Sequence, residues 1–338
     1  MIKDTIKIVS NKKDLNAEQM SEVFEEIMCG AASKEEMKTF LLALKDKGES
    51  PDEIAAAAGI MREKATKVIT SIDNLIDTCG TGGALIHDIN VSTIVAFIMA
   101  GCGVKVAKHG NRSFTGRCGS ADILEALGVN INTTPEKVAY LIENVGIGFI
   151  FAKNFHPAMK NVMEARKELK TRTIFNILGP LSNPAGANQQ ILGVFDPGLT
   201  EIIAKSLKRL GSSNAIVVHG MEGLDEISIK GRTKITELDT DGSIRTSMVS
   251  PEDFGLKEGD IDDIRGGDVN YNKGKVLDIL QGRDNSPRRD MVLMNAAAGL
   301  KMLGKVPDYK SGVTMAAECI DSGRAYAKLK LLIEMSNG

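Results

Sequence analysis

From Asn74 onwards, short strand-like runs alternate with helical segments, and this alternation limits the folds open to the chain. The runs that predict strands are rich in apolar residues and cover 74–78, 104–108, 148–152, 190–196 and 214–220. Helical segments separate them, among them 91–102, 156–170 and 199–210. Helices between consecutive strands connect parallel neighbours. We therefore expect an α/β domain with a mainly parallel central sheet covered by helices.

Two stretches depart from this alternation. The segment 226–249 predicts three further strands, in EISIKG, TKITELD and SIRTSMV, before three closing helices over 271–281, 288–303 and 311–335. The Pro/Gly-rich stretch 176–186 is either a loop, a hinge or a crossing to another part of the fold.

The first 70 residues carry helix signals and no strand signal. Asn16 with Gln19 and Ser33 with Glu36 have the spacing of a capping box, and Ser50 precedes a proline at the first helical position. These signals predict three short amphipathic helices, which would form a small helical domain or subdomain.

Composition excludes several classes of function. The net charge of −2 over 338 residues gives no broad electrostatic grip on nucleic acid. The five cysteines contain no CxxC pair, which argues against a structural zinc site, and their odd number favours a reduced, cytoplasmic protein. The longest apolar run, 94–104, is too short to span a membrane, so we expect no membrane association.

The segment DTCGTGG (77–83) places Gly80, Gly82 and Gly83 between a strand and a helix. Such a turn either presents free N–H groups to an anion or is simply tight, with no ligand. It is no P-loop, because no Gly-Lys-Ser/Thr follows. Leu85 stands where a dinucleotide-binding fingerprint needs its third glycine.

A second glycine-rich loop, KHGNRSFTGRCGSAD (108–122), follows the next strand and carries three cations against one acid. Ligands in open α/β sheets sit beyond the carboxyl ends of the strands, where both loops should meet. Together they offer amides, hydroxyls and cations to a polyanion, although a solvated basic loop is the alternative.

Single residues carry weaker signals. Asp225 and Glu226 are adjacent carboxylates suited to Mg²⁺, provided that a turn at Gly223 aims both at one site; otherwise they are a solvated acidic pair. Arg166 alone is typical of a solvated helix face, and His156 before Pro157 is typical of a packing residue, so neither predicts a functional site by itself. The four histidines have no metal-ligand spacing, and no nucleophile elbow is present.

The motifs DTCGTGG, NVST, VKVAKHGNRS, GSADILEALGV, HPAM, RTIFNILGPLSNPA and VVHGMEGLDE occur in this order. In this combination the chain resembles the anthranilate phosphoribosyltransferases over nearly its whole length. The resemblance implies a helical domain at 1–72, with helices from about 156–186 packing on it, and an α/β domain at 73–338. It also implies a homodimer formed through the helical domain.

The resemblance further implies transfer of phosphoribose from phosphoribosyl pyrophosphate (PRPP) to the amine of anthranilate, in tryptophan biosynthesis, with Mg²⁺ as cofactor, in two ions. The residues implied to bind PRPP are Gly80, Gly82, Gly83, Asn90, Val91, Ser92, Thr93, Lys108, His109, Gly110, Asn111, Arg112, Ser113, Gly116 and Ser120. Those implied for anthranilate are Gly80, Asn111, Arg166, His109 and His156, with the Gly179-Pro180 turn beside its channel. Those implied for Mg²⁺ are Ser92, Asp225 and Glu226. An aniline-type amine is neutral near pH 7, so no acid or base is assigned.

One segment departs from the family. Ala84 stands where the family has an aspartate near PRPP, and Asp88 stands where it has threonine, with Leu85, Ile86 and His87 between them. A change in PRPP affinity or metal dependence is expected there. The pyrimidine nucleoside phosphorylases share the fold and are the alternative enzyme class. A third class is a non-catalytic member that binds nucleic acid or another ligand. The acidic net charge opposes nucleic acid, and the retained Asp225, Glu226 and Arg166 oppose loss of catalysis.

Overall fold

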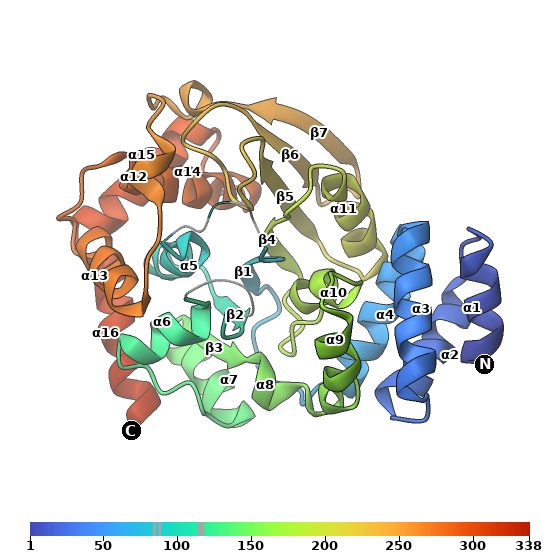
Figure 1. Ribbon diagram of the computed structural model, residues 1–338. Coiled ribbons are helices and arrows are strands. Elements are labelled where there is room, and N and C mark those ends of the chain that lie inside the picture. Colours follow the sequence, from blue (N-terminus) through green and yellow to red (C-terminus); the bar gives the residue numbers. More distant parts are fainter. Residues whose placement is uncertain (84–85, 87–88, 114–117) are drawn as a thin grey trace.

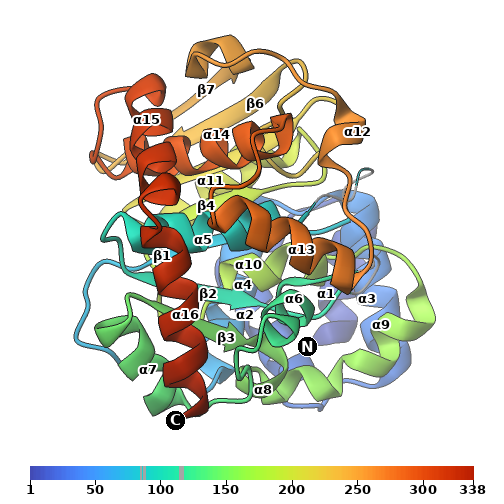
Figure 2. The same cartoon turned by 90° about the vertical axis from the view of Figure 1, so that its left-hand side faces the viewer.

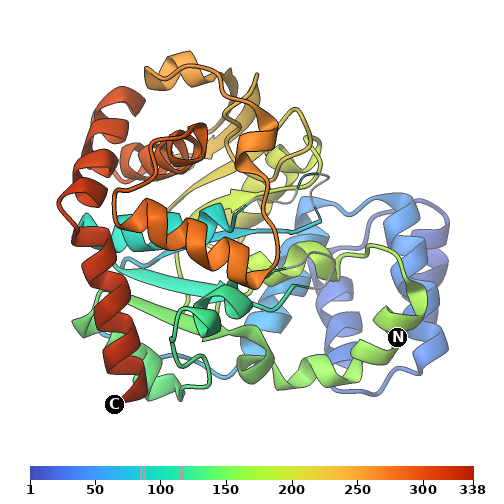
Figure 3. The same cartoon turned by 60° about the vertical axis from the view of Figure 1, so that its left-hand side comes forward.

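The computed structural model describes residues 1–83, 86, 89–113 and 118–338 (Figure 1). It confirms the expected fold class, with a small helical part at the N-terminus beside a larger α/β part. The N-terminal helices lie to one side of the sheet, far from the C-terminal helix (Figure 3).

Four helices form the N-terminal part, which are α1 (Ile2–Ser10), α2 (Ala17–Met28), α3 (Lys34–Lys47) and α4 (Pro51–Lys64). The capping boxes at Asn16 and Ser33 are present, and Ser50 forms a third one with Glu53. The sequence prediction of three helices missed α1. That helix has no side-chain N-cap and begins at the second residue, so the usual start signal is lacking.

The described residues form one seven-stranded sheet with the order β3-β2-β1-β4-β5-β6-β7. Its strands are β1 (Ile76–Gly80), β2 (Val106–Gly110), β3 (Ile147–Phe151), β4 (Gln189–Gly193), β5 (Asn214–Gly220), β6 (Thr233–Leu238) and β7 (Ile244–Val249). The neighbours β3, β2, β1, β4 and β5 are parallel, and β6 and β7 add an antiparallel edge. The chain leaves β1 toward β2 on one side and returns to β4 on the other, which creates a topological switch point at β1.

Helices cover the sheet on both faces (Figure 2). Those of the first half are α5 (Val91–Gly101), α6 (Ser120–Ala126), α7 (Pro135–Asn144), α8 (Ala152–Phe155), the 3₁₀ turn η1 (Pro157–Asn161), α9 (Met163–Leu169) and α10 (Phe175–Leu181). Those of the second half are α11 (Leu199–Arg209), η2 (Pro251–Phe254), α12 (Ile261–Ile264), α13 (Val269–Leu280), α14 (Pro287–Met302), α15 (Tyr309–Asp321) and α16 (Arg324–Asn337). No described helix is both long and apolar enough to cross a membrane.

Three sequence predictions are corrected here. The run EISIKG forms bends and irregular backbone instead of a strand, because side chains bond with its backbone groups. Ser228, for example, bonds with both the N–H and the carbonyl of Lys230. The last predicted helix is two helices, since Gly323 adopts φ 76° between α15 and α16. The expected helix at 156–170 is η1 followed by α9.

The segment 176–186 begins inside α10 and belongs to a crossing between the two parts of the fold. Phe175 and Leu178 share one buried core with Phe24 and Phe40 of the N-terminal helices, and the Phe24 and Phe175 rings lie 5.6 Å apart. In Figure 1, α9 and α10 stand between the sheet and the N-terminal helices. The domain boundary at residue 72 stays a prediction; it falls between the end of α4 and the start of β1.

Candidate active site

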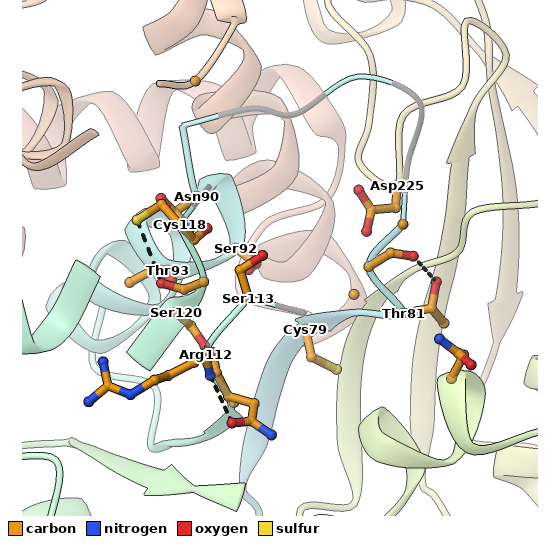
Figure 4. A pocket seen from close by; sticks show the side chains of 18 of the residues that line it. Cys79, Thr81, Asn90, Ser92, Thr93, Arg112, Ser113, Cys118, Ser120 and Asp225 are labelled. Atoms are coloured by element: carbon orange, nitrogen blue, oxygen red, sulfur yellow. Dashed lines mark hydrogen bonds between the residues drawn. The ribbon is translucent and has the colours of Figure 1, made fainter. Parts of the chain in front are cut away.

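A pocket of about 960 Å³ lies at the carboxyl ends of the central strands, at the switch point beside β1. Loops after β1, β2 and β5 line it, together with α9 and the segment before α13. The predicted site residues among its lining are Gly80, Gly82, Gly83, Asn90, Ser92, Thr93, Lys108, His109, Gly110, Asn111, Arg112, Ser113, Ser120, Arg166, Asp225 and Glu226. Figure 4 shows Asp225 near Thr81, with Asn90, Cys118 and Ser120 on the opposite side.

Two described residues of the predicted site, Val91 and His156, are not part of the pocket lining. Val91 is buried within α5, and His156 lies behind His109. Gly116 lies outside the described residues, as do Ala84, Leu85, His87 and Asp88 of the segment that departs from the family.

The glycines at the ends of β1 and β4 make room for Asp225, Gly80 for its carboxylate and Gly193 for its main chain. A Cβ on Gly80 would lie 2.7 Å from Oδ2 of Asp225, and one on Gly193 would lie 1.5 Å from the Asp225 carbonyl oxygen. At Gly193 a Cβ would overlap main-chain atoms, so no side chain fits there; at Gly80 a Cβ would force the Asp225 carboxylate to move. The close approach of Asp225 to the glycine turn therefore depends on both glycines.

The two adjacent carboxylates, Asp225 and Glu226, both line the pocket. Gly223 adopts φ 97° just after β5, which is the turn that the sequence analysis required for this. Asn295 of α14 holds the following segment: its Oδ1 accepts from the N–H of Ile227 at 2.9 Å, and its Nδ2 donates to the Ile227 carbonyl at 3.1 Å.

The chemistry of this donor set fits Mg²⁺. Two carboxylates and the nearby Ser92 hydroxyl are hard oxygen donors, the kind that Mg²⁺ prefers. Among the described residues, no three His, Cys, Asp or Glu side chains gather as a metal site. A Mg²⁺ ion here would therefore take further oxygens from water or from phosphate groups of a ligand.

A buried polar cluster lies between β1 and β2 beneath the pocket. The two strands pair only at Ile76 and Val106, and beyond that point hydrogen bonds from side chains take the place of backbone pairing. Asp77 Oδ1 accepts from the N–H of His109 at 3.2 Å, and Asn183 Nδ2 donates to both Asp77 Oδ2 and the Ala107 carbonyl at 2.8 Å. Burial raises the pKa of Asp77 to about 6, against the opposing charge of Lys108.

Lys108 brings a buried cation to the pocket floor. Its ammonium donates to the Thr78 carbonyl at 2.6 Å and to Ser92 Oγ at 3.4 Å, and its side chain is only 2% exposed. Burial lowers the pKa of Lys108, and the charge of Asp77 opposes this shift. The carboxylate thus favours the charged form of the lysine.

His109 and His156 form a buried pair with their Nε2 atoms 3.1 Å apart. Burial, and then the neighbouring His156, lower the pKa of His109 to about 3; burial lowers that of His156 to about 4. Both rings are therefore neutral near pH 7, with one Nε2–H donating to the other ring.

Cations surround the mouth of the pocket. Arg166 of α9 lies with its guanidinium 5.5 Å above the Phe175 ring, and burial lowers its pKa. Arg112 pairs with Asp122 and Glu125, both at 2.8 Å, so ion pairs hold Arg112 against α6.

Sequence reasoning missed several residues that line the pocket, among them Thr81, Arg172, Arg265 and Asn272. Arg172 donates to the Gly83 carbonyl and stacks 4.0 Å from the centre of the Phe195 ring, so it ties the glycine turn to the segment between α9 and α10. Its run, RTIFN, contributed to the resemblance and was the available signal. Asn272 lies in a helix whose sequence carries no functional pattern.

Comparison with known proteins identifies the family of the chain. The model of the glycosyl transferase family, a/b domain, matches residues 72–326, and that of the glycosyl transferase family, helical bundle domain, matches residues 3–65. The anthranilate phosphoribosyltransferase of Persephonella marina is 52% identical, with all of both chains covered.

The chain is also similar to solved structures of anthranilate phosphoribosyltransferases. The anthranilate phosphoribosyltransferase of Thermus thermophilus superposes with a TM-score of 0.93 at 40% identity, covering 99% of this chain and all of the other. That of Saccharomyces cerevisiae, in complex with PRPP and Mg, has a TM-score of 0.90 at 28% identity and covers 99% of this chain and 98% of its own. The yeast enzyme has also been solved with 4-fluoroanthranilate, at a TM-score of 0.88 and 27% identity, covering 100% of this chain and 98% of its own.

Proposed function

The chain belongs to the anthranilate phosphoribosyltransferases, and we propose from this premise that its pocket transfers phosphoribose from PRPP to the amine of anthranilate. The reaction gives N-(5-phosphoribosyl)anthranilate and pyrophosphate, a step of tryptophan biosynthesis. One observation carries the proposal: two glycine-rich loops, a carboxylate pair and Arg166 line a single pocket.

PRPP has the charge distribution that this pocket would accept. The loops after β1 and β2, with Lys108 and Ser120, would hold its phosphates through amides, hydroxyls and a cation. Asp225, Glu226 and Ser92 would hold Mg²⁺, which neutralises charge on a pyrophosphate leaving group when bound. We propose two such ions.

Anthranilate would enter from the side of α9. Arg166 would bind its carboxylate, and Asn111 and Gly80 would lie near its ring. During transfer, the bond between ribose C1 and the pyrophosphate oxygen breaks, the bond from the amine nitrogen to C1 forms, and the amine proton leaves to water or pyrophosphate. Positioning and electrostatics supply the acceleration, since the neutral pair His109 and His156 provides no strong base.

We further propose a homodimer formed through the N-terminal helices and a cytoplasmic location. The reduced state expected of the five cysteines supports the location.

One assay tests the proposed reaction against the alternative enzyme class. The protein is mixed with PRPP, Mg²⁺ and anthranilate, and the loss of anthranilate fluorescence is followed; parallel reactions hold phosphate with thymidine or uridine. We expect rapid loss of anthranilate and no nucleoside cleavage. A stable anthranilate signal together with nucleoside phosphorolysis would instead identify a pyrimidine nucleoside phosphorylase.

A further inference from the structure

Asn272 of α13 is a buried polar residue beside the pocket, with only 1% of its surface exposed. It lies on a helix that crosses beside α6 at this edge of the molecule (Figure 2). Burying an amide is unfavourable unless its donors and acceptor are satisfied, so its partners indicate what it does.

Its hydrogen bonds connect three segments that line the pocket. The N–H of Gly267 donates to Asn272 Oδ1 at 2.8 Å, and Asn272 Nδ2 donates to Asn90 Oδ1 at 2.8 Å. Asn90 Nδ2 in turn donates to the Cys118 carbonyl at 3.0 Å. Gly267, Asn90 and Cys118 all line the pocket.

This chain of bonds determines the orientation of the Asn90 amide. A flipped amide would bring Asn90 Nδ2 against Asn272 Nδ2 and Asn90 Oδ1 against the Cys118 carbonyl, which are two repulsive contacts. Only the present orientation satisfies both neighbours.

The backbone conformation at Asn90 determines how α5 begins. This residue has φ 65° and ψ 49°, a left-handed conformation that asparagine tolerates better than most non-glycine residues, and its side chain makes no cap bond to α5, so bonds from other segments set where it lies. Ser92 and Thr93 follow within the first turn of that helix, so a shift at Asn90 moves them as well.

We infer that Asn272 is a positioning residue for the PRPP side of the pocket, acting through Asn90. The inference rests on the proposed function. It assigns to α13 the task of holding the N-terminus of α5 in register with the backbone at Cys118, so that both lie against one ligand.

The test uses two variants and a matched control. Asn272→Asp keeps size and the acceptor for Gly267 but loses the donor to Asn90, and Asn272→Ala loses both. Asn270→Asp makes the same chemical change at an exposed position of the same helix. Steady-state constants for both substrates and melting temperatures are measured for each.

We expect Asn272→Asp and Asn272→Ala to raise the PRPP KM about tenfold or more and the anthranilate KM less than about threefold, because an unsatisfied buried partner disturbs Asn90. Asn270→Asp should change neither constant. In an Asn90→Ala background, Asn272→Ala should raise the PRPP KM no further, since its effect passes through Asn90.

Four results would overturn the inference. Two are kinetic: an equal rise in both KM values, and independent effects of the two substitutions in the double variant. The other two would mark Asn272 as a purely structural residue: a lower melting temperature with unchanged kinetic constants, and loss of folding in both Asn272 variants. If the unmodified protein does not consume anthranilate, the proposed function fails instead, and this is visible before any variant is made.

Discussion

Gly80→Ala tests whether the glycine turn and the carboxylate pair form one unit. The added Cβ would lie 2.7 Å from Asp225 Oδ2, whereas ordinary contacts begin at 3.4 Å, so the carboxylate must move by about 0.7 Å. Functional groups have to be held within about 0.5 Å of their productive positions. A misplacement of about 1 Å can cost about 100-fold in rate.

We therefore expect Gly80→Ala to lower kcat/KM by about 10- to 100-fold and to raise the Mg²⁺ concentration needed for half-maximal activity. Folding should change little, because the contact is with the end of a side chain. Gly193→Ala should be more severe and should also impair folding, since its Cβ would lie 1.5 Å from a main-chain oxygen.

The assays are a Mg²⁺ titration of the initial rate at saturating PRPP and anthranilate, titrations of each substrate at saturating Mg²⁺ that give kcat/KM, and thermal unfolding. Gly59→Ala is the matched control, because a Cβ there meets nothing within 4 Å. An unchanged titration and an unchanged kcat/KM for Gly80→Ala would refute the argument that Asp225 functions where it lies against the turn.

Three further predictions concern other groups of the site. Arg166→Ala should raise the anthranilate KM far more than the PRPP KM, since a charged hydrogen bond to a carboxylate contributes about 1.5–3 kcal/mol; equal effects on the two constants would contradict the assignment. Asp225→Asn combined with Glu226→Gln should weaken the response of the rate to Mg²⁺, and an unaltered metal titration would exclude the pair as ligands. The pKa of His156 falls from its usual 6.5 to about 4 on folding, because burial disfavours the charged ring. Its contribution to the free energy of unfolding is therefore complete above about pH 6.5, and it is lost as the pH falls toward about 4 because the unfolded state takes up the proton first. His156→Gln should therefore flatten the fall in unfolding free energy over this range by up to about 3 kcal/mol, measured by urea unfolding at several pH values; parallel curves for both proteins would disprove the linkage.

Local rules predicted much of the fold correctly. Capping boxes at Asn16 and Ser33 gave α2 and α3, and the apolar run NAIVVHG coincides with β5. The failures have local causes. The helix α1 has no side-chain N-cap, so its sequence carries no start signal. The run EISIKG has the composition of a strand, but its backbone forms hydrogen bonds with side chains such as Ser228 instead of a neighbouring strand.

For the site, sequence spacing predicted that two loops would meet, because parallel strands bring their carboxyl ends together. It left the binding of an anion by the glycine turn undecided, since a short motif does not reveal its neighbours. The structure adds that Gly80 and Gly193 admit Asp225.

Contacts across long sequence distances were not predictable from pattern. Asn272 bonds with a residue 182 positions away, and Arg172 bonds across 89 positions. Such pairs depend on how the helices close around the sheet, and no local periodicity encodes them.

The central claim is that this pocket couples pyrophosphate release to consumption of anthranilate. The most direct measurement counts both in the same reaction, with PRPP, anthranilate and Mg²⁺ present and then with the metal chelated. We predict that one pyrophosphate is released for each anthranilate consumed. After chelation of the metal we predict neither pyrophosphate release nor anthranilate consumption. Pyrophosphate released without loss of anthranilate, or turnover that is indifferent to chelation, would contradict the account.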